Sequence, residues 1–432
     1  MRCEIVQRLF KRTHPETIVE TENEIDCDDN TSNEMPNENE KSEENRKSIE
    51  KSNEQNDKNE IPFIPESHDI PDQLIPDLIE RVRVCADLSH DLCKLTVRTV
   101  ISCLMESIPS WTNQCQAIIK KLDDQNIESH IHSNVQSSDL INLKAAFKKL
   151  WWCKNDEQQR SWPVHQDEDL IRSYLDEIHQ IISNANPMHI RDLILGFHYE
   201  NVHMLVTYFQ METRRSLRMK LLTIFHCLIG IFEQLIPEYF LSSVLPAELA
   251  VEMQNYIDDE ERWCSSALLF TSIFSTAHKP PINIYEHINE IFIDKQLNII
   301  ESIDGHGNRI DDLKIPPENS IAPILSFNLH FDDPETNLVL NALRKRKNAS
   351  QLTEKLVSYL NWEEDITKVN CTKLSNEESS QDDLKMNSAL KLLIEMFDDN
   401  LVSKLFYYND VRVIIDIIIR QLNNLPAGDK VS

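Results

Sequence analysis

The sequence predicts an all-α protein, an armadillo/HEAT-like helical repeat array preceded by a disordered acidic N-terminal tail. The chain has 432 residues but only five glycines, and glycine is what β-rich architectures and phosphate-binding loops need. From about Gln73 onward, apolar residues recur every three or four positions between short polar or proline-marked breaks, which is typical of helices. Because the chain exceeds the usual size of one compact domain, a stack of helices that bury their faces against neighbours fits it best.

The N-terminal part is expected to lie outside that array. Residues 16–72 are predicted to form a disordered acidic tail and a proline-marked linker, because Glu, Asn, Ser, Lys and Asp dominate as far as Glu60 and leave too little apolar surface to offset the entropy of ordering. A Pro62-x-x-Pro65 pair follows without an adjacent Arg or Lys. It is either a ligand for SH3-containing signalling adaptors or a simple boundary segment. The helical domain is placed at residues 73–432.

The segment Met204 to Gln254 is the most informative part of this domain. Apolar residues at three-and-four spacing predict a helix with one buried face, and they are Leu217, Leu221, Ile224, Phe225, Leu228 and Phe232. One end of the same helix carries a basic cluster made of Arg214, Arg215, Arg218 and Lys220. This cluster is either a solvated helix end or a contact surface for a partner.

Two further segments show the same periodicity. One stripe, in Asp169 to Ile182, consists of Leu170, Ile171, Tyr174, Leu175, Ile178, Ile181 and Ile182. The other, near the end of the chain, consists of Val411, Ile414, Ile415, Ile418 and Leu422. Two polar stretches, Asp304 to Asn319 and Trp362 to Lys385, interrupt the helical pattern and are expected to be surface loops.

Acidic residues mark two helix starts. The run Asp258 to Glu261 is predicted to begin a helix, where anions are favoured by the helix dipole, rather than to serve acid catalysis. Asp332-Asp333-Pro334 is predicted to cap and open a helix through Leu338 and Leu343. At the end of that helix, Arg344 to Lys347 (RKRK) is interpreted as a solvated helix terminus.

Charge and cysteine usage exclude several classes of partner. A net charge of -28 argues against nucleic acid and against an anionic membrane surface, and favours a protein partner with basic surfaces. The ten cysteines contain no C-x-x-C pair. Residues such as Cys103 and Cys227 are interpreted as reduced core residues of a cytoplasmic protein. No signal peptide and no stretch long enough to insert into a membrane is apparent.

The chain is not predicted to be an enzyme and needs no cofactor. His130 and His132 are the nearest approach to a metal motif, but their polar, irregular surroundings favour an exposed loop, and the metal-dependent hydrolase is the weaker interpretation. His306 between two glycines is interpreted as a turn residue. No nucleophile elbow and no phosphate loop occurs in the sequence.

Four segments carry a resemblance to a known family. The strings run from Asn155 to Ile182 (NDEQQRSWPVHQDEDLIRSYLDEIHQII), Tyr208 to Leu222 (YFQMETRRSLRMKLL), Ser242 to Gln254 (SSVLPAELAVEMQ) and Phe406 to Lys430 (FYYNDVRVIIDIIIRQLNNLPAGDK). They occur in order across about 350 residues, and QQRSW and SSVLP-x-ELA are the most specific. The chain thereby resembles the leucine-rich domain of the Nck-interacting protein with SH3 domain.

The resemblance implies an armadillo-like domain that binds the actin-related protein 2/3 (Arp2/3) complex and activates it without a preformed filament. Linear actin filaments would be the product, in the cytoplasm at the cell cortex or at endocytic sites. The alternative is a passive helical adaptor that has lost nucleation. For partner contacts we expect Arg214, Arg215 and Arg218, together with Glu248, Glu252 and Gln254 beyond the SSVLP turn.

The chain departs from the family pattern at both ends. No SH3 domain is recognised, and residues 1–15 are expected to be the remnant of a helix that follows such a domain. The basic proline-rich region that would recruit SH3 partners is replaced by the acidic tail. The family continues beyond the last helix, so the domain is expected to be truncated there and to expose an apolar face on its last helix.

Overall fold

The computed structural model describes residues 70–71, 73–86, 88–123, 138–155, 167–232, 235–302, 316–363, 365–368 and 387–424. Within these ranges the chain forms 17 α-helices and no β-strand, which confirms the predicted all-α class. The helices are α2 (Leu74–Ala86), α3 (His90–Ser107), α4 (Thr112–Asp123), α6 (Ser138–Asn155), α8 (Glu168–Asn184), α9 (Pro187–Gly196), α10 (Glu200–Met211), α11 (Arg215–Phe232), α12 (Leu235–Leu241), α13 (Leu245–Asn255), α14 (Glu260–Phe274), α15 (Glu290–Glu301), α16 (Pro317–Asn328), α17 (Leu338–Arg344), α18 (Ser350–Trp362), α19 (Ser388–Asp398) and α20 (Tyr408–Asn424). Three short 3-10 helices accompany them, η1 (Pro109–Trp111), η3 (Ile282–Glu286) and η4 (Val402–Leu405).

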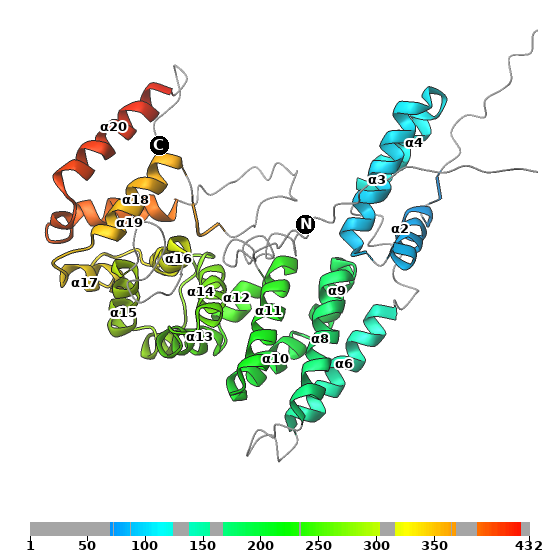
Figure 1. Ribbon diagram of the computed structural model, residues 1–432, viewed down its shortest axis with the longest axis horizontal. Coiled ribbons are helices and arrows are strands. Elements are labelled where there is room, and N and C mark those ends of the chain that lie inside the picture. Colours follow the sequence, from blue (N-terminus) through cyan, green and yellow to red (C-terminus); the bar gives the residue numbers. More distant parts are fainter. Residues whose placement is uncertain are drawn as a thin grey trace, which may run out of the picture.

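The helices are arranged in two rows that run along the molecule (Figure 1). In one row α6, α8, α11, α14, α16 and α19 each pack against the next. In the other, α10 packs on α13, α13 on α15, and α15 on α18, which also contacts α20. Consecutive helices cross from row to row, as α13 and α14 or α15 and α16 do. Such pairwise stacking is the arrangement expected of an armadillo/HEAT-like array.

The hydrophobic core is divided into two parts. The larger part is one continuous cluster that extends from Leu143 in α6 to Ile414 in α20. A smaller cluster joins only α2, α3 and α4 around Ile79 and Cys93. An ion pair of 2.6 Å between Arg83 of α2 and Asp139 of α6 connects the two parts. The predicted domain 73–432 therefore contains a three-helix unit with a core of its own.

Helix α11 lies at the centre of the larger core because its apolar stripe faces inward. All six residues predicted to form its buried face are at most 3% exposed. Phe225 packs edge-to-face on Phe209 of α10 and on Phe240 of α12. The stripe in α8 is confirmed for Ile171, Leu175, Ile178 and Ile182, whereas Leu170 is 48% exposed.

Local capping explains where two helices begin, and one of the two predictions was wrong. Asp259 is the N-cap of α14, and its carboxylate accepts a hydrogen bond from the backbone N–H of Arg262, as the acidic run predicts. Asp333 instead forms a turn, with its Oδ1 accepting from the backbone N–H of Glu335. The N-cap of α17 is Asn337, whose Oδ1 accepts from the backbone N–H groups of Val339 and Leu340. Pro334 therefore belongs to the turn and not to the first turn of a helix.

One sequence interpretation of a single residue also changes. Cys103 is an exposed thiol on α3 rather than a core residue, whereas Cys227 is partly buried against the larger core, as expected. Leu95 and Val100 of α3 are exposed as well, so an apolar residue beside Cys103 does not by itself place that thiol in the core.

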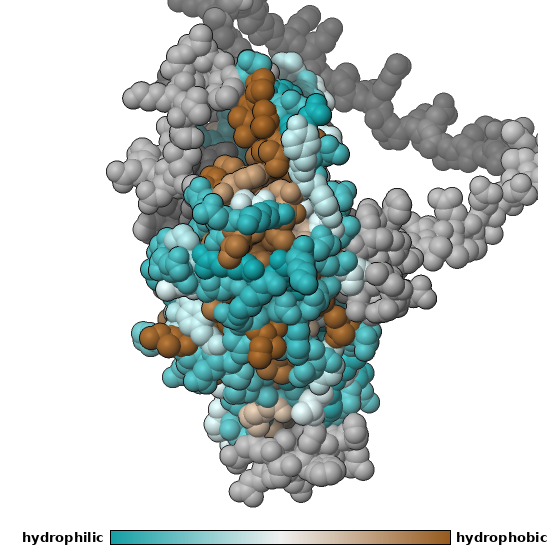
Figure 2. Space-filling view, turned by 90° about the vertical axis from the view of Figure 1, so that its left-hand side faces the viewer, coloured by the Kyte–Doolittle hydropathy of each residue, from teal (hydrophilic) through white to brown (hydrophobic). Residues whose placement is uncertain are grey.

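The last helix buries one side and exposes another. Ile414 and Ile417 are each 4% exposed, whereas Ile415, Ile418 and Ile419 are 43–51% exposed. Figure 2 views the molecule from the α17–α20 end, and a hydrophobic stripe runs along its upper part, where α20 lies. The expected apolar face on the last helix is thus present.

Several predictions lie outside the described residues. They concern residues 1–15, most of the tail 16–72, His130, His132 and His306, and the greater part of both expected surface loops. In the part of the chain that the structure does describe, no helix is long and apolar enough to cross a membrane.

Candidate functional site

The basic cluster at the start of α11 is mostly enclosed by the array. Arg214 is 8% exposed and lies in the short connection between α10 and α11. Its Nη2 and Nε donate to Glu212 at 2.7 and 2.9 Å, and Glu212 also accepts a hydrogen bond of 3.1 Å from the hydroxyl of Tyr208. Glu212 further accepts from the backbone N–H groups of Thr213 and Arg214. This carboxylate therefore fixes the turn that leads into α11.

The hydrogen bonds and charges within this turn favour the charged forms of Glu212 and Arg214. Burial acts to raise the pKa of Glu212, but the hydrogen bonds and the positive charge of Arg214 outweigh it and hold that pKa below its usual range. The hydrogen bond to Glu212 in turn raises the pKa of Arg214. Burial, with the neighbouring carboxylate, raises the pKa of Tyr208. The pair is hence a permanent ionic link at neutral pH.

A second network joins α11 to α13 and α14. Glu252 is 2% exposed, accepts a hydrogen bond from Nη2 of Arg262 and forms an ion pair with Nη2 of Arg218, each at 2.8 Å from its Oε1. Arg262 also reaches Glu252 through its Nε. The guanidinium of Arg218 lies 3.9 Å from the ring centroid of Phe209. Buried charges are tolerated only when they are paired in this way.

Three of the six predicted contact residues are therefore buried structural groups. Arg214, Arg218 and Glu252 are no more than 8% exposed, so a partner would reach them only if the helices separated. Residue type and position along the helix suggested a surface, but α10 and α14 pack against α11, and Glu252 of α13 pairs with Arg218.

The other three predicted contact residues reach the surface. The side chain of Arg215 is 50% exposed, and its Nη2 donates at 2.7 Å to both Asp259 and Glu261. Glu248 has a 22% exposed side chain and approaches Arg218 at 3.5 Å. Gln254 accepts a bond of 3.3 Å from Lys295.

The second basic cluster has a more specific role than a solvated helix end. Arg344 ends α17 and pairs with Asp399 at 2.6 Å, and Arg346 pairs with Asp294 of α15 at 2.9 Å. The side chain of Arg346 is only 11% exposed. These arginines fasten α17 to its neighbours, whereas Lys345 and Lys347 remain exposed.

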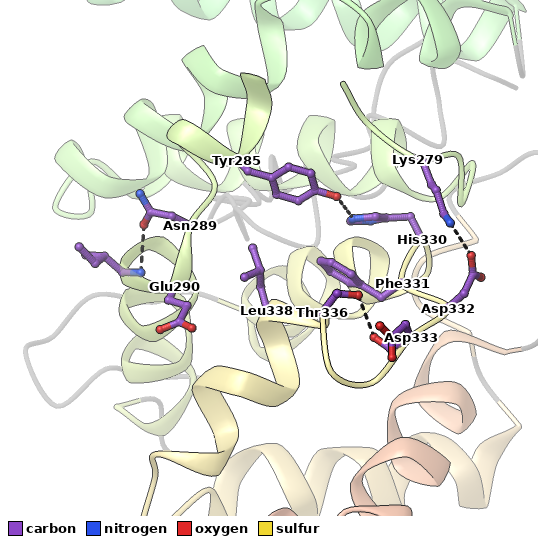
Figure 3. A pocket seen from close by; sticks show the side chains of 11 residues that line it. Lys279, Tyr285, Asn289, Glu290, His330, Phe331, Asp332, Asp333, Thr336 and Leu338 are labelled. Atoms are coloured by element: carbon purple, nitrogen blue, oxygen red, sulfur yellow. Dashed lines mark hydrogen bonds and ion pairs between the residues drawn. The ribbon is translucent and has the colours of Figure 1, made fainter. Parts of the chain in front are cut away.

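A hollow of about 730 Å³ lies between η3, the start of α15 and the connection from α16 to α17. In Figure 3 the side chains of Tyr285, His330, Phe331 and Leu338 surround its middle. Polar groups stand at its two ends, where Lys279 pairs with Asp332 at 2.8 Å on one side and Asn289 caps α15 on the other (Figure 3). Tyr285 Oη and His330 Nε2 share a hydrogen bond of 2.9 Å. We call this feature the α15–α17 hollow.

The wall of the hollow is held from behind by α19. Lys391 donates at 3.0 Å to the carbonyl oxygen of Asn328 and at 2.8 Å to that of Phe331. Asn328 donates to Glu395 at 2.6 Å and accepts from Asn337 at 2.8 Å. These bonds satisfy the last carbonyl groups of α16 and fix both ends of the connection.

His330 contributes an apolar face rather than a charge. It is 3% exposed, and its ring centroid lies 4.0 Å from that of Phe331 and 4.8 Å from that of Phe327. Burial lowers its pKa to about 4. At neutral pH the imidazole is therefore uncharged, and the middle of the hollow is an aromatic and aliphatic surface.

Sequence reasoning did not identify the hollow, because its residues come from segments about 50 positions apart. One signal was available. Ile291 lies on the side of α15 that also carries Lys295 and Asn298, away from the buried Ile293 and Leu297, and it is 67% exposed. An aliphatic residue on an otherwise polar helical face indicates a contact surface.

The described residues thus form a helical array whose arginine–carboxylate clusters are largely internal and which carries a hollow lined by apolar side chains. Residues 315–432 match the sequence model of the SPIN90/Ldb17 leucine-rich domain family. The match covers α16 to α20 and hence the α16–α17 wall of the hollow. For this segment it confirms the resemblance inferred from the sequence.

Proposed function

We propose that this chain binds the Arp2/3 complex and activates it without a preformed filament, so that a linear actin filament is nucleated at the cell cortex or at endocytic sites. The observation that carries the proposal is the match of residues 315–432 to the SPIN90/Ldb17 leucine-rich domain. The strings in α8, α10–α11, α13 and α20 extend the same resemblance over most of the array.

Activation of this kind is a population shift. A binding protein moves the complex between an inactive and a filament-like arrangement only through its different affinities for the two, and about 5.5 kcal/mol converts a 1:99 mixture to 99:1. A scaffold can contribute this difference only if it keeps its own shape. The continuous core and the internal ion pairs of Glu212 and Glu252 favour such rigidity.

Arg215 is the residue of the basic cluster that remains suited to contact a partner. Its guanidinium is half-exposed and is held in place by two carboxylates, so it presents N–H donors in a fixed position at low entropic cost. Glu248 and Gln254, at the edge of α13, are the remaining proposed contacts.

The test is polymerisation of fluorescent actin with purified Arp2/3 complex, the full chain and no preformed filaments. We expect a shorter lag that depends on the concentrations of both the chain and the complex. An unchanged lag would overturn the proposal for this chain. Co-sedimentation with the complex but no stimulation would instead favour the passive adaptor.

A matched pair of variants tests the contact surface. Arg215→Ala should weaken binding to the complex, whereas Arg98→Ala should not. Arg98 also has a 50% exposed side chain in an ion pair, with Asp123 at 2.6 Å, but it lies on α3. Both variants should keep the wild-type melting temperature, because exposed ion pairs contribute only about 0–1 kcal/mol. Equal binding by the two variants would remove Arg215 from the proposed contact surface.

A further inference from the structure

The α15–α17 hollow exposes apolar surface that the rest of the fold does not require. Ile291 at its edge is 67% exposed, and Ile282 of the adjoining η3 is 87% exposed. Burying such side chains against a partner removes apolar surface from water and so favours binding. The hollow has a volume of about 730 Å³, within the range of about 300–1,000 Å³ that is usual for binding pockets.

The hollow is also already formed. Its α16–α17 wall is bonded to α19 through Lys391 and Asn328, and the first turn of α15 is capped by Asn289. Binding of a ligand would therefore cost little entropy for ordering the surface of the hollow, and more of the contact energy would contribute to affinity.

The charges around the hollow are predominantly acidic. Among its lining residues, Glu290, Asp332 and Asp333 are carboxylates and Lys279 is the basic residue. Lys279 pairs with Asp332, and Lys345 from α17 pairs with Glu290. The described residues provide no such partner for Asp333, which is exposed. An apolar surface beside unpaired negative charge is complementary to apolar side chains flanked by positive charge.

We propose that the α15–α17 hollow is a docking site for a segment of a partner protein that carries one or two large apolar side chains flanked by Lys or Arg. The apolar side chain fills the space between Tyr285, Phe331 and Leu338 and covers Ile291. The flanking basic groups face Asp333 and the neighbouring carboxylates. This inference goes beyond the proposed function, because it does not depend on the Arp2/3 complex being the partner.

Charge argues against a second copy of this chain as the occupant. The chain has a net charge of -28, so two copies repel each other. The exposed isoleucines of α20 belong to a helix in which Asp410 and Asp416 offset Arg412 and Arg420, so this helix offers the hollow no net positive charge. A partner with a basic surface meets neither obstacle.

Selection from a displayed library of random peptides tests the proposal without assuming a partner. The full chain is the target, and the Ile291→Lys variant is used for counter-selection, because residue 291 is exposed enough to change without unfolding the protein. We expect enrichment of peptides with Leu, Ile, Phe or Trp flanked by Lys or Arg. Absence of enrichment over the variant, or enrichment of acidic or purely polar peptides, would overturn the proposal.

Fluorescence anisotropy with one enriched, labelled peptide measures the effect. Ile291→Lys should weaken binding at least tenfold, whereas Ile415→Lys, the same exchange at a 50% exposed position on α20, should leave it unchanged. Asp333→Asn should weaken binding several-fold at low salt and less at high salt, since exposed charges are screened. Equal affinities for Ile291→Lys and wild type would place the peptide elsewhere and overturn the assignment.

Two other possible occupants of the hollow are distinguished by peptide competition and by sedimentation velocity. Residues 2–12 (RCEIVQRLFKR) combine apolar and basic side chains, so the peptide of that sequence is tested as a competitor. If it binds the hollow more tightly than every selected peptide, the chain's own segment replaces the external partner. Self-association in sedimentation velocity that is abolished by Ile291→Lys would assign the hollow to a second copy.

Discussion

Replacing Glu252 by Gln should destabilise the array strongly, although the change keeps the size and shape of the side chain. The carboxylate is 2% exposed and lies between the guanidinium groups of Arg218 and Arg262, which are 6% and 4% exposed. The substitution leaves both positive charges buried without their shared counter-ion. Removing one partner from a buried ion pair typically costs about 3–5 kcal/mol.

The size of the loss depends on what each arginine retains. Arg218 keeps two backbone carbonyl acceptors and a distant contact to Glu248 at 3.5 Å. Arg262 keeps the ring of Tyr256, 3.4 Å from its guanidinium carbon. Because Gln still offers one acceptor oxygen, we expect the lower end of the range, about 3 kcal/mol. At about 2 °C per kcal/mol for a large domain, the melting temperature falls by about 6 °C.

Circular dichroism at 222 nm during heating measures this change, with Glu248→Gln as the matched control. Glu248 lies on the same helix but has a 22% exposed side chain and the longer 3.5 Å contact, so its exchange should cost less than about 1 kcal/mol. The double variant Glu252→Gln/Arg262→Met should recover part of the loss, because it removes a buried charge that would otherwise be unpaired. If the two single variants melted at the same temperature, Glu252 would not be the structural centre of this network.

Three further outcomes follow from single contacts. Burial lowers the pKa of both His226 and His330 to about 4, so between pH 6.5 and 4 the unfolded chain binds more protons than the folded one. The free energy of unfolding should therefore fall with decreasing pH in that window, by about 2 kcal/mol per histidine at pH 5. Chemical denaturation at several pH values measures this dependence, and the unfolding free energy of His226→Gln should change less steeply with pH than that of the wild type. An unchanged slope would contradict the burial of His226. Lys391→Met removes the donor to the last carbonyl group of α16 and to that of Phe331 in the following connection, and should cost about 1.5–3 kcal/mol. Hydrogen exchange between α16 and α17 should be faster than in the exposed control Lys404→Met; equal exchange would show that α19 does not hold that wall. Asn337→Ala removes the N-cap of α17 and should lower the unfolding free energy by about 1–2 kcal/mol, and a loss near zero would contradict the capping role.

The helices could be predicted because burial imposes a period on the sequence. In α11, Leu217 to Phe232 repeat every three or four residues and are buried as expected, since the helix has a core neighbour on that side. In α3 the expectation that Cys103 lies in the core was wrong. This helix packs in the small unit of α2 to α4, which covers less of its surface, and Cys103 is exposed.

Helix starts were predictable where the suitable cap residues are adjacent. Before α14, Asp258 and Asp259 indicate the same start to within one residue, and Asp259 is the cap. Before α17, Asp332, Asp333 and Asn337 are all suitable N-cap types within six positions. The turn at Asp333 has its own hydrogen bond to the backbone, and that local alternative moved the helix start to Asn337.

The position of the charged residues could not be derived from their own segment. Arg214, Arg215 and Arg218 are near neighbours in sequence, yet one is half-exposed and two are buried. Arg218 is buried where it pairs with Glu252 of α13, 34 positions further along the chain, and Arg214 is buried where it pairs with Glu212 beside Tyr208 of α10. A basic cluster in sequence thus indicates charge, whereas the tertiary partner decides whether that charge binds another protein or stabilises the fold.

Ile291 is the converse case. In sequence it is an aliphatic residue on a helical side that also carries Lys295 and Asn298, and this was the one signal of a contact surface there. In the structure it lies at the edge of the α15–α17 hollow, beside a ring pair formed by Tyr285 and His330 from two other segments. The groups best suited to bind a partner are therefore apolar residues left outside the core, and the arginines that resembled a binding surface are largely used inside it.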